Sequence, residues 1–230
     1  NDVQDALFLN KNLKNNKLFI YILNPSNLAF IDMIKALESK SVQVRVDYSN
    51  ASFEERIIQD AQKRFGLVIV NQDIFASRKN RKALFDLSIP VLKTGWELIE
   101  ECKKSFVILS ENMGDSENVA SVVFDISKQL RLDIDVYDYD TDAAYHNEIV
   151  QRYEELSRIF ERKMNTLQTD SKNPILYLQD SFMSYLSFVP FERGISRTKT
   201  FSFLSTDVHK IASMNSKNPQ VFIPLPKERK

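Results

Sequence analysis

Short apolar runs alternate with segments of helical period along most of the chain, and this order occurs twice. The first copy, residues 17–95, contains the runs LFIYIL, SNLAFIDMIKALESK, VQVRVDY, SFEERIIQDAQKRF and GLVIV. Strands that alternate with helices of about 10 to 15 residues are joined by right-handed crossovers and form a parallel sheet. From Lys104 the order returns, and KSFVILS and LDIDVYD follow KLFIYIL and VQVRVDY by about 90 residues. An internal duplication is the simplest account.

The repeat predicts two α/β domains with parallel, doubly wound sheets. The first, residues 1–98, is a shortened and degenerate copy, and the second spans residues 99–230. Between them TGWELIEECKK, residues 94–104, forms a short amphipathic connection, too well patterned for a flexible linker. A chain of 230 residues with 43% hydrophobic content is long enough to bury two cores of this size.

Composition excludes several classes of protein. The 31 basic residues balance the 31 acidic ones, so no overall field attracts nucleic acid. Cys102 is the only cysteine, which excludes an internal disulfide and favours a cytoplasmic location. No apolar run reaches the roughly 18 residues that cross a bilayer. The chain begins at Asn1 rather than at methionine, which is consistent with a piece of a longer protein.

No pattern predicts catalysis or a metal site. Patterns typical of nucleophilic serines, P-loops or dinucleotide-binding loops are absent from a chain with four glycines. His146 and His209 have no second ligand at metal-binding spacing, and Cys102 is expected to pack in the connection. The acidic run DIDVYDYDTD lacks the glycine and glutamate of a calcium loop, so Asp133 and Asp135 are expected on a solvated strand edge. We therefore expect a non-enzymatic protein.

The end of the chain has the layout of a phosphate-binding loop. In residues 184–226 a buried strand is followed by a polar loop with Gly194, a helix opened by Ser205 and Thr206, and a strand ended by prolines. Such a loop, at the carboxyl edge of a parallel sheet, offers backbone N–H groups to a phosphate. Arg193 and Arg197 add charge to it. An ordinary solvated loop with a capping serine is the alternative.

This ending resembles the universal stress proteins, whose nucleotide-binding members carry Gly-x2-Gly-x9-Gly followed by Ser or Thr, then a helix and a last strand. The helix and the strand match STDVHKIASMNSKNPQVFIPLP, and the resemblance covers about residues 104–226. The three glycine positions fall on Phe191, Gly194 and Leu204, with Ser205 next. Side chains at the first and third positions hinder close approach of a phosphate to the backbone.

The resemblance implies a flavodoxin-like α/β fold and an adenine nucleotide as ligand, ATP, ADP or AMP. It implies phosphate contacts at Gly194, Ser205 and Thr206, charge from Arg193 or Arg197, and adenine near Val136 to Asp138. The acidic residue beside the ribose falls on Glu111 or Asp115. Affinity is expected to be modest and to fall with salt, because loop cations supply much of it.

Tandem degenerate domains of this kind are similar to the cytoplasmic C-terminal regions of some bacterial monovalent cation/proton antiporters. That resemblance implies a non-catalytic regulatory module at the cytoplasmic face of the inner membrane, attached to a transporter. A structural dimerisation domain without ligand and a separate stress protein with slow nucleotide hydrolysis stay open as alternatives. Self-association through the last strand, PQVFIPL, predicts a homodimer or an intramolecular pseudo-dimer.

Overall fold

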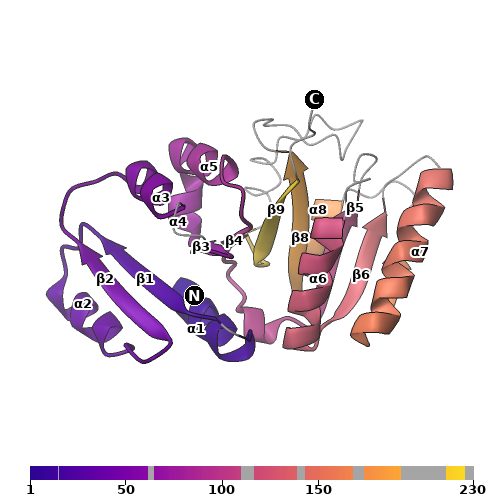
Figure 1. Cartoon of the computed structure of the whole chain (residues 1–230), viewed down its shortest axis with the longest axis horizontal. Helices are drawn as coiled ribbons and strands as arrows, with labels where there is room; N and C mark the ends of the chain where they lie inside the picture. Colours follow the sequence, from indigo (N-terminus) through magenta and orange to yellow (C-terminus); the bar gives the residue numbers. More distant parts are fainter. Residues whose placement is uncertain are drawn as a thin grey trace.

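The computed structural model describes residues 1–14, 16–61, 65–109, 117–138, 143–167, 174–192 and 216–225. Helices and strands alternate through these ranges (Figure 1), and the chain is α/β as predicted. The first half, residues 1–98, contains α1 (Asp2–Asn12), β1 (Leu18–Leu23), α2 (Leu28–Lys35), β2 (Val42–Asp47), α3 (Phe53–Ala61), β3 (Val68–Val70), α4 (Gln72–Ala76), α5 (Arg78–Phe85) and β4 (Val91–Lys93).

The second half, residues 99–230, begins with a short 3₁₀ helix and continues with five parallel strands. Its elements are η1 (Ile99–Glu101), β5 (Lys104–Leu109), α6 (Glu117–Leu130), β6 (Asp133–Asp138), α7 (Ala143–Phe160), β7 (Met164–Leu167), α8 (Pro174–Asp180), β8 (Tyr185–Glu192) and β9 (Gln220–Leu225). Among the elements that the structure describes, no helix is both long and apolar enough to cross a membrane.

The strands of the described ranges form two sheets that do not divide at the predicted boundary. β1 and β2 make a parallel pair of their own, while β3 and β4 join the second half in a sheet ordered β3-β4-β9-β8-β5-β6-β7. β3 and β4 of the first half therefore extend the sheet of the second half and do not pair with β1 or β2. The assignment of residues 1–98 and 99–230 to separate domains stays a prediction.

The two halves meet where β4 pairs with β9 in the antiparallel sense, the one antiparallel pair among the described strands. Val91 lies opposite Phe222, and Lys93 lies opposite Gln220. β9 also pairs with β8 on its other side, so both of its edges are occupied within the chain. An apolar last strand that would otherwise be an exposed edge is thus covered.

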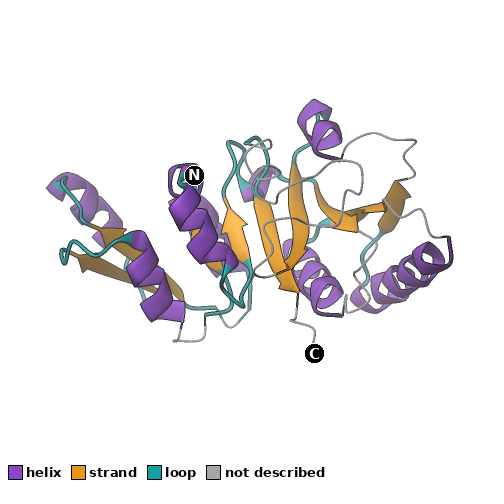
Figure 2. Ribbon diagram, turned by 90° about the horizontal axis from the view of Figure 1, so that it is seen from above, coloured by secondary structure: helices purple, strands orange, loops and turns teal. Residues whose placement is uncertain are grey.

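Helices cover both faces of the seven-stranded sheet (Figure 2). On one face α6 and α7 contribute Val123, Phe124 and Tyr153 to a core that also contains Val107 and Val221. The other core has its own set of side chains from both halves, among them Phe75, Leu84, Phe106, Leu178, Val189 and Phe222. Because strands with both faces buried need apolar residues at every position, the near-continuous apolar runs of the sequence are explained.

The helix α1, which the sequence pattern did not predict, packs against β1, β3 and η1. Leu9 reaches the core beside α6, and Asn1 donates hydrogen bonds to the carbonyls of Gly95 and Trp96 at 3.1 and 2.7 Å. The carboxylate of Asp5 accepts a hydrogen bond from the Ile99 N–H at 2.7 Å. α1 therefore ties the start of the chain to the connection between the two halves.

Asp5 is 1% exposed, and its second carboxylate oxygen has no hydrogen-bond partner among the described residues. Burial raises the pKa of Asp5 to about 6, although the hydrogen bond from Ile99 lowers it. A carboxyl group whose folded pKa lies above its unfolded value of 3.8 binds its proton more tightly in the folded state. Its ionisation therefore costs stability as the pH rises from about 4 to about 6.

We expect Asp5→Asn to raise the free energy of unfolding by about 2 kcal/mol at pH 7.5, because the amide keeps an acceptor for Ile99 and carries no buried charge. At pH 4 most of the gain disappears, since Asp5 is then neutral in the folded state and only partly ionised in the unfolded state. Urea unfolding at pH 4, 5, 6 and 7.5 measures the difference, with Asp73→Asn as an exposed control on α4. An equal effect of Asp5→Asn at all four pH values would contradict the raised pKa of Asp5 in the folded state.

Candidate functional site

The carboxyl edge of the second-half sheet has a point at which the strand order reverses. β5 is bonded to β6 on one side and to β8 on the other. After β5 the chain continues to β6 and β7 on one side of the sheet, whereas after β8 it continues to β9 on the other side. The connections that follow β5 and β8 therefore run in opposite directions along the sheet. In open α/β sheets, ligands bind outside the carboxyl ends of the strands at such a point. The ends of β5 and β8 therefore define the candidate site.

Two of the predicted ligand-binding residues lie on β6, next to this point. Val136 is fully buried between Val107 of β5 and Thr166 of β7. Asp138 is the last residue of β6 and lies opposite Leu109 of β5. Val136 is thus a core position, and Asp138 is the member of the pair that stands at the carboxyl edge.

The other predicted ligand-binding residues lie outside the described residues. The structure describes β8 up to Glu192 and then begins again at Ser216. The residues concerned are Glu111, Arg193, Gly194, Arg197, Ser205 and Thr206. Asp115, the alternative to Glu111, lies outside them too, so these assignments stay predictions. The same holds for Leu204 at the third glycine position and for His209, which was not expected to bind a ligand.

Phe191 does not occupy a loop, in contrast to the expectation from the glycine spacing. It is the seventh residue of β8, lies opposite Pro224 of β9 and is 2% exposed. Its ring packs edge-on against Phe85 of α5, with the ring centroids 4.8 Å apart. The strand runs one residue beyond Phe191, so a backbone cradle for phosphate cannot begin at that position.

A buried polar cluster on β6 was missed by the sequence interpretation. Asp135 is 2% exposed, and its carboxylate forms an ion pair with Lys104 at 2.9 Å. Asn165 and Tyr185 donate to the same carboxylate at 3.0 and 3.3 Å. The expectation of a solvated strand edge was wrong for Asp135, because β6 lies between β5 and β7. A carboxylate on an interior strand needs partners such as these.

Burial raises the pKa of Tyr185 above its ordinary range, and its contact with Tyr177 adds to the shift. The phenol therefore stays protonated and serves as a hydrogen-bond donor to Asp135. Lys104 and Tyr185 begin their strands, so the cluster lies at the amino edge of the sheet. It stabilises the sheet at the edge opposite the candidate site.

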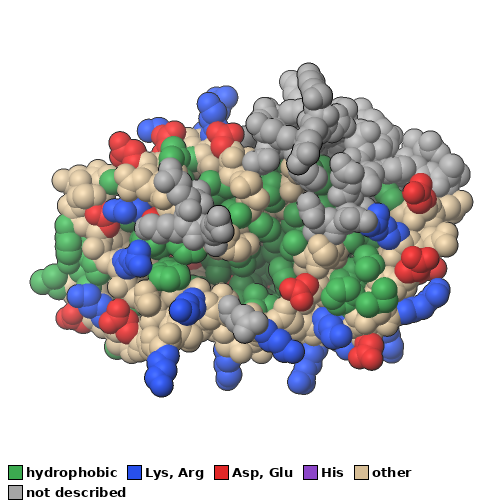
Figure 3. Space-filling view, viewed as in Figure 1, with side chains coloured by type: hydrophobic (Ala, Val, Ile, Leu, Met, Phe, Trp, Pro, Cys, Tyr) green, Lys and Arg blue, Asp and Glu red, His purple; other side chains and the backbone are tan. Residues whose placement is uncertain are grey.

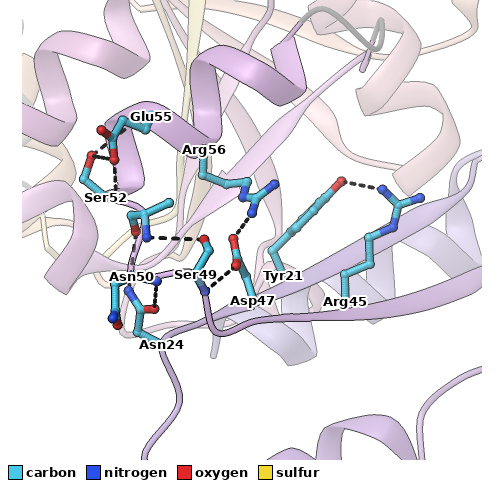
Figure 4. Close-up of polar contacts among 10 residues, drawn as sticks. Tyr21, Asn24, Arg45, Asp47, Ser49, Asn50, Ser52, Glu55 and Arg56 are labelled. Atoms are coloured by element: carbon cyan, nitrogen blue, oxygen red, sulfur yellow. Dashed lines mark hydrogen bonds and ion pairs between the residues drawn. The ribbon is translucent and has the colours of Figure 1, made fainter.

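The carboxyl ends of β1 and β2 carry a second group of polar side chains (Figure 4). Asp47 at the end of β2 forms an ion pair with Arg56 of α3. Asn24 and Asn50 adopt left-handed backbone conformations. The side-chain oxygen of Asn24 accepts a hydrogen bond from the backbone N–H of Asn50 at 3.0 Å. Ser52 and Glu55 form a reciprocal capping pair at the start of α3.

These side chains bond to one another and so close the turns after β1 and β2. Arg45 lies over the rings of Phe19 and Tyr21, 5.1 and 5.8 Å from their centroids. Asparagine tolerates the left-handed region because its short amide bonds locally, which explains its use at positions 24 and 50. The first-half edge is therefore a set of structural turns.

Within the described ranges, no three His, Cys, Asp or Glu side chains are placed to hold a metal ion. Cys102 is buried, and burial raises the pKa of its thiol above the ordinary range, so the side chain packs as an unreactive thiol.

A pocket of about 480 Å³ opens beside the connection between the two halves. It is lined by Trp96, Glu97, Gln179, Ser216 and Lys217. Lys217 there donates to the Ser181 carbonyl at 2.7 Å and lies 3.6 Å from Glu97.

No family model and no curated protein matches the chain. Two solved structures resemble it over most of its length: protein PA1789 of Pseudomonas aeruginosa PAO1, whose function is unknown, and a candidate universal stress protein of Pseudomonas aeruginosa UCBPP-PA14. Each superposes with a TM-score of 0.55 at 15% sequence identity, over 90% of this chain and 82% of the other. The fold is shared with these proteins.

The shared fold agrees with the α/β architecture that the sequence resemblance implied. The match extends over 90% of the chain, so it reaches well beyond the five parallel strands of the second half. The α/β fold of the chain therefore also occurs in these two Pseudomonas aeruginosa proteins.

Proposed function

We propose that the chain is a non-catalytic regulatory module that binds an adenine nucleotide at the carboxyl edge of β5 and β8. The observation that supports this most is the reversal of strand order between these two strands. Ligands of doubly wound proteins lie at such reversals. One of the similar structures is a candidate universal stress protein, and the adenine nucleotide is proposed by analogy with the nucleotide-binding members of that family, which the end of this chain resembles.

The ligand chemistry follows from the residues that β8 leads into. Arg193 and Arg197 supply charge to the phosphates, and Gly194 with Ser205 and Thr206 supplies hydrogen bonds. The buried Phe191 shortens the loop from its β8 side, so the phosphate cradle begins after Glu192. We therefore expect modest affinity, about 100 µM, with a strong dependence on salt.

Calorimetric titration with ATP, ADP and AMP, with and without magnesium, tests this proposal. We expect saturable binding that Gly194→Val weakens at least about tenfold, because a branched side chain obstructs the backbone donors. Gly66→Val is the matched control, since a Cβ at Gly66 meets no atom within 4 Å. Absence of heat and of a thermal shift at millimolar nucleotide would refute nucleotide binding, and release of phosphate from ATP would refute the non-catalytic role.

We further propose that the chain is attached to a monovalent cation/proton antiporter at the cytoplasmic face of the inner membrane. It rests on the resemblance of the degenerate tandem arrangement to the soluble regions of such transporters. An interaction domain without ligand is the second candidate, and the exposed apolar side chains of α2, Leu28, Phe30 and Met33, favour it. A titration without binding, combined with self-association, would select this second function.

A further inference from the structure

The pocket beside the connection has walls from both halves of the chain. Figure 1 shows the end of β4 next to the start of β9, and the pocket opens at this junction. Its lining comes from the segment after β4, the segment before β9 and the helix α8: Trp96, Glu97, Ser216, Lys217 and Gln179. Its volume of about 480 Å³ lies within the range of about 300 to 1,000 Å³ that is usual for small-molecule sites.

Hydrogen bonds hold the walls of this pocket in place. The Trp96 N–H donates to the Ser216 carbonyl at 3.0 Å, and the Glu97 N–H donates to the Lys217 carbonyl at 3.1 Å. The Lys217 ammonium donates to the Ser181 carbonyl at 2.7 Å. The pocket is therefore formed before a ligand arrives, which lowers the entropic cost of binding.

Trp96 provides a flat surface at the pocket. It is the only tryptophan of the chain, and its side chain is 71% exposed although its backbone is bonded to the opposite wall. Aromatic side chains in such positions stack on flat heteroaromatic rings, and every nucleobase has a face that stacks in this way. Trp96 therefore favours a flat ring without selecting one base over another.

Glu97 and Lys217 provide the selective groups. The Lys217 Nζ lies 3.6 Å from the Glu97 Oε1, so a donor and an acceptor stand side by side. The Glu97 Oε2 is shielded from water and has no hydrogen-bond partner among the residues that the structure describes. A carboxylate oxygen in that state is unfavourable, so a ligand that brings a donor to it gains affinity.

The Glu97 carboxylate can meet a ligand with both oxygens. The terminal torsion of a glutamate side chain is broad, so a small rotation turns Oε2 toward the pocket. A carboxylate accepts two parallel hydrogen bonds, and an ammonium group has three donors, so Lys217 keeps donor capacity beyond its bond to Ser181. The matching ligand edge has two adjacent donors followed by an acceptor.

Guanine is the common nucleobase with this order of groups. Its 2-amino group and N1–H are adjacent donors, and its O6 acceptor comes next. Adenine and cytosine each have one amino donor beside a ring-nitrogen acceptor, and uracil has one N–H between two carbonyl oxygens. Each of these three bases would set a lone pair against one oxygen of the Glu97 carboxylate.

We propose that this pocket binds the guanine base of a nucleoside or nucleotide. The base stacks on Trp96, its N1–H and 2-amino group donate to the Glu97 carboxylate, and its O6 accepts from Lys217. β9 runs parallel to β8, so a pocket before the start of β9 lies at the edge of the sheet opposite the carboxyl ends of β5 and β8. The guanine site is therefore separate from the nucleotide site proposed above.

Local groups, and not a broad field, select the ligand. Figure 3 shows Lys, Arg, Asp and Glu side chains interspersed on one face of the molecule, and the 31 basic residues of the chain balance the 31 acidic ones. A chain of this charge does not concentrate polyanions at its surface. The base itself therefore supplies the binding, which makes a small guanine compound the expected ligand.

Tryptophan fluorescence tests the proposal, because the emission of Trp96 reports this pocket alone. Guanosine should quench the emission saturably, with a dissociation constant of about 100 µM. Adenosine, cytidine and uridine should bind at least about tenfold more weakly, and so should inosine, which lacks the 2-amino group. Guanosine and GMP with equal affinity would identify the base as the whole determinant, and tighter binding of GMP would identify the nucleotide as the ligand.

A substitution at Glu97 tests the hydrogen-bond pattern. Glu97→Gln should weaken guanosine binding at least about tenfold and shift the preference toward adenosine, because an amide offers one acceptor beside one donor. Glu100→Gln is the matched control, since Glu100 is exposed on η1 outside the pocket. In calorimetry, Trp96→Phe should keep more of the affinity than Trp96→Ala, and thermal unfolding shows whether each variant is folded.

Four results would overturn the proposal. They are the absence of quenching at millimolar guanosine, equal affinity for all the nucleosides, equal effects of Glu97→Gln and Glu100→Gln, and quenching by arginine but not by guanosine. The last result would assign the pocket to a guanidinium cation held between Trp96 and Glu97. Calorimetric binding of ATP without any change in Trp96 emission would leave the nucleotide site at β5 and β8 intact, so the two proposals fail separately.

Discussion

Gly95→Ala is expected to reduce the free energy of unfolding by about 3 kcal/mol, although it adds a single methyl group. Gly95 follows β4 and lies against the segment that leads into β9. A Cβ at this position would overlap the Lys217 carbonyl oxygen and would lie 2.6 Å from the Asn218 carbonyl carbon and 2.7 Å from the Pro219 nitrogen. These are backbone atoms, so no side-chain rotation relieves the overlap.

The overlap lies beside the hydrogen bonds that continue the β4–β9 pair. Trp96 N–H donates to the Ser216 carbonyl at 3.0 Å, and Glu97 N–H donates to the Lys217 carbonyl at 3.1 Å. We expect these bonds to weaken together when the backbones are forced apart. Urea unfolding of Gly95→Ala against Gly66→Ala measures the effect, since the latter site has open space around it. A loss below about 1 kcal/mol for Gly95→Ala would mean that the segment before β9 can move freely.

The sequence was sufficient to predict the strands and most of the helices that follow them. The apolar run SFVIL became β5, because a strand buried on both faces needs apolar residues at successive positions. The run LFIYIL became β1, although only Ile22 of that strand is buried. α1 left no such record. Leu9 and Asp5 are buried on it by contacts with residues far along the chain, which a local period does not contain.

The distribution of strands between sheets could not be predicted from the same runs. β3 and β4 are three residues long, and their apolar side chains would suit either sheet. The pairing of β4 with β9 joins Val91 to Phe222, which are separated by most of the chain. Periodicity states which residues are buried, but the strand partner depends on the shape of the assembled cores.

The sequence pattern predicted the strand end at Asp138, but it misplaced Phe191 and Asp135. Asp138 stands at the carboxyl end of β6, as the resemblance implied, because the order of strands fixes that edge. Phe191 was placed in a loop because glycine spacing was extended into what is the end of β8. Asp135 was expected in solvent because the partners of its carboxylate, Lys104 and Tyr185, belong to two other strands.

Phe222→Ala is expected to have the largest effect on stability, a loss of about 4 kcal/mol, or roughly 10 °C in Tm for a chain of this size. Phe222 of β9 is fully buried. Its ring stacks on Phe75 of α4 at 5.4 Å and meets Phe85 of α5 edge-on at 5.3 Å. Both partners belong to the first half, so this one side chain joins residues of the two halves within a single core.

Because of this position, we expect Phe222→Ala to loosen both halves together. Hydrogen exchange measured by mass spectrometry should show reduced protection in β3 and β4 as well as in β8 and β9. Phe182→Ala is the matched control, because Phe182 is fully exposed, and it should leave both Tm and protection unchanged. If protection fell in β8 and β9 alone while β3 and β4 kept theirs, the aromatic contacts with Phe75 and Phe85 would not couple the halves, and the cavity would be a local defect of the second half.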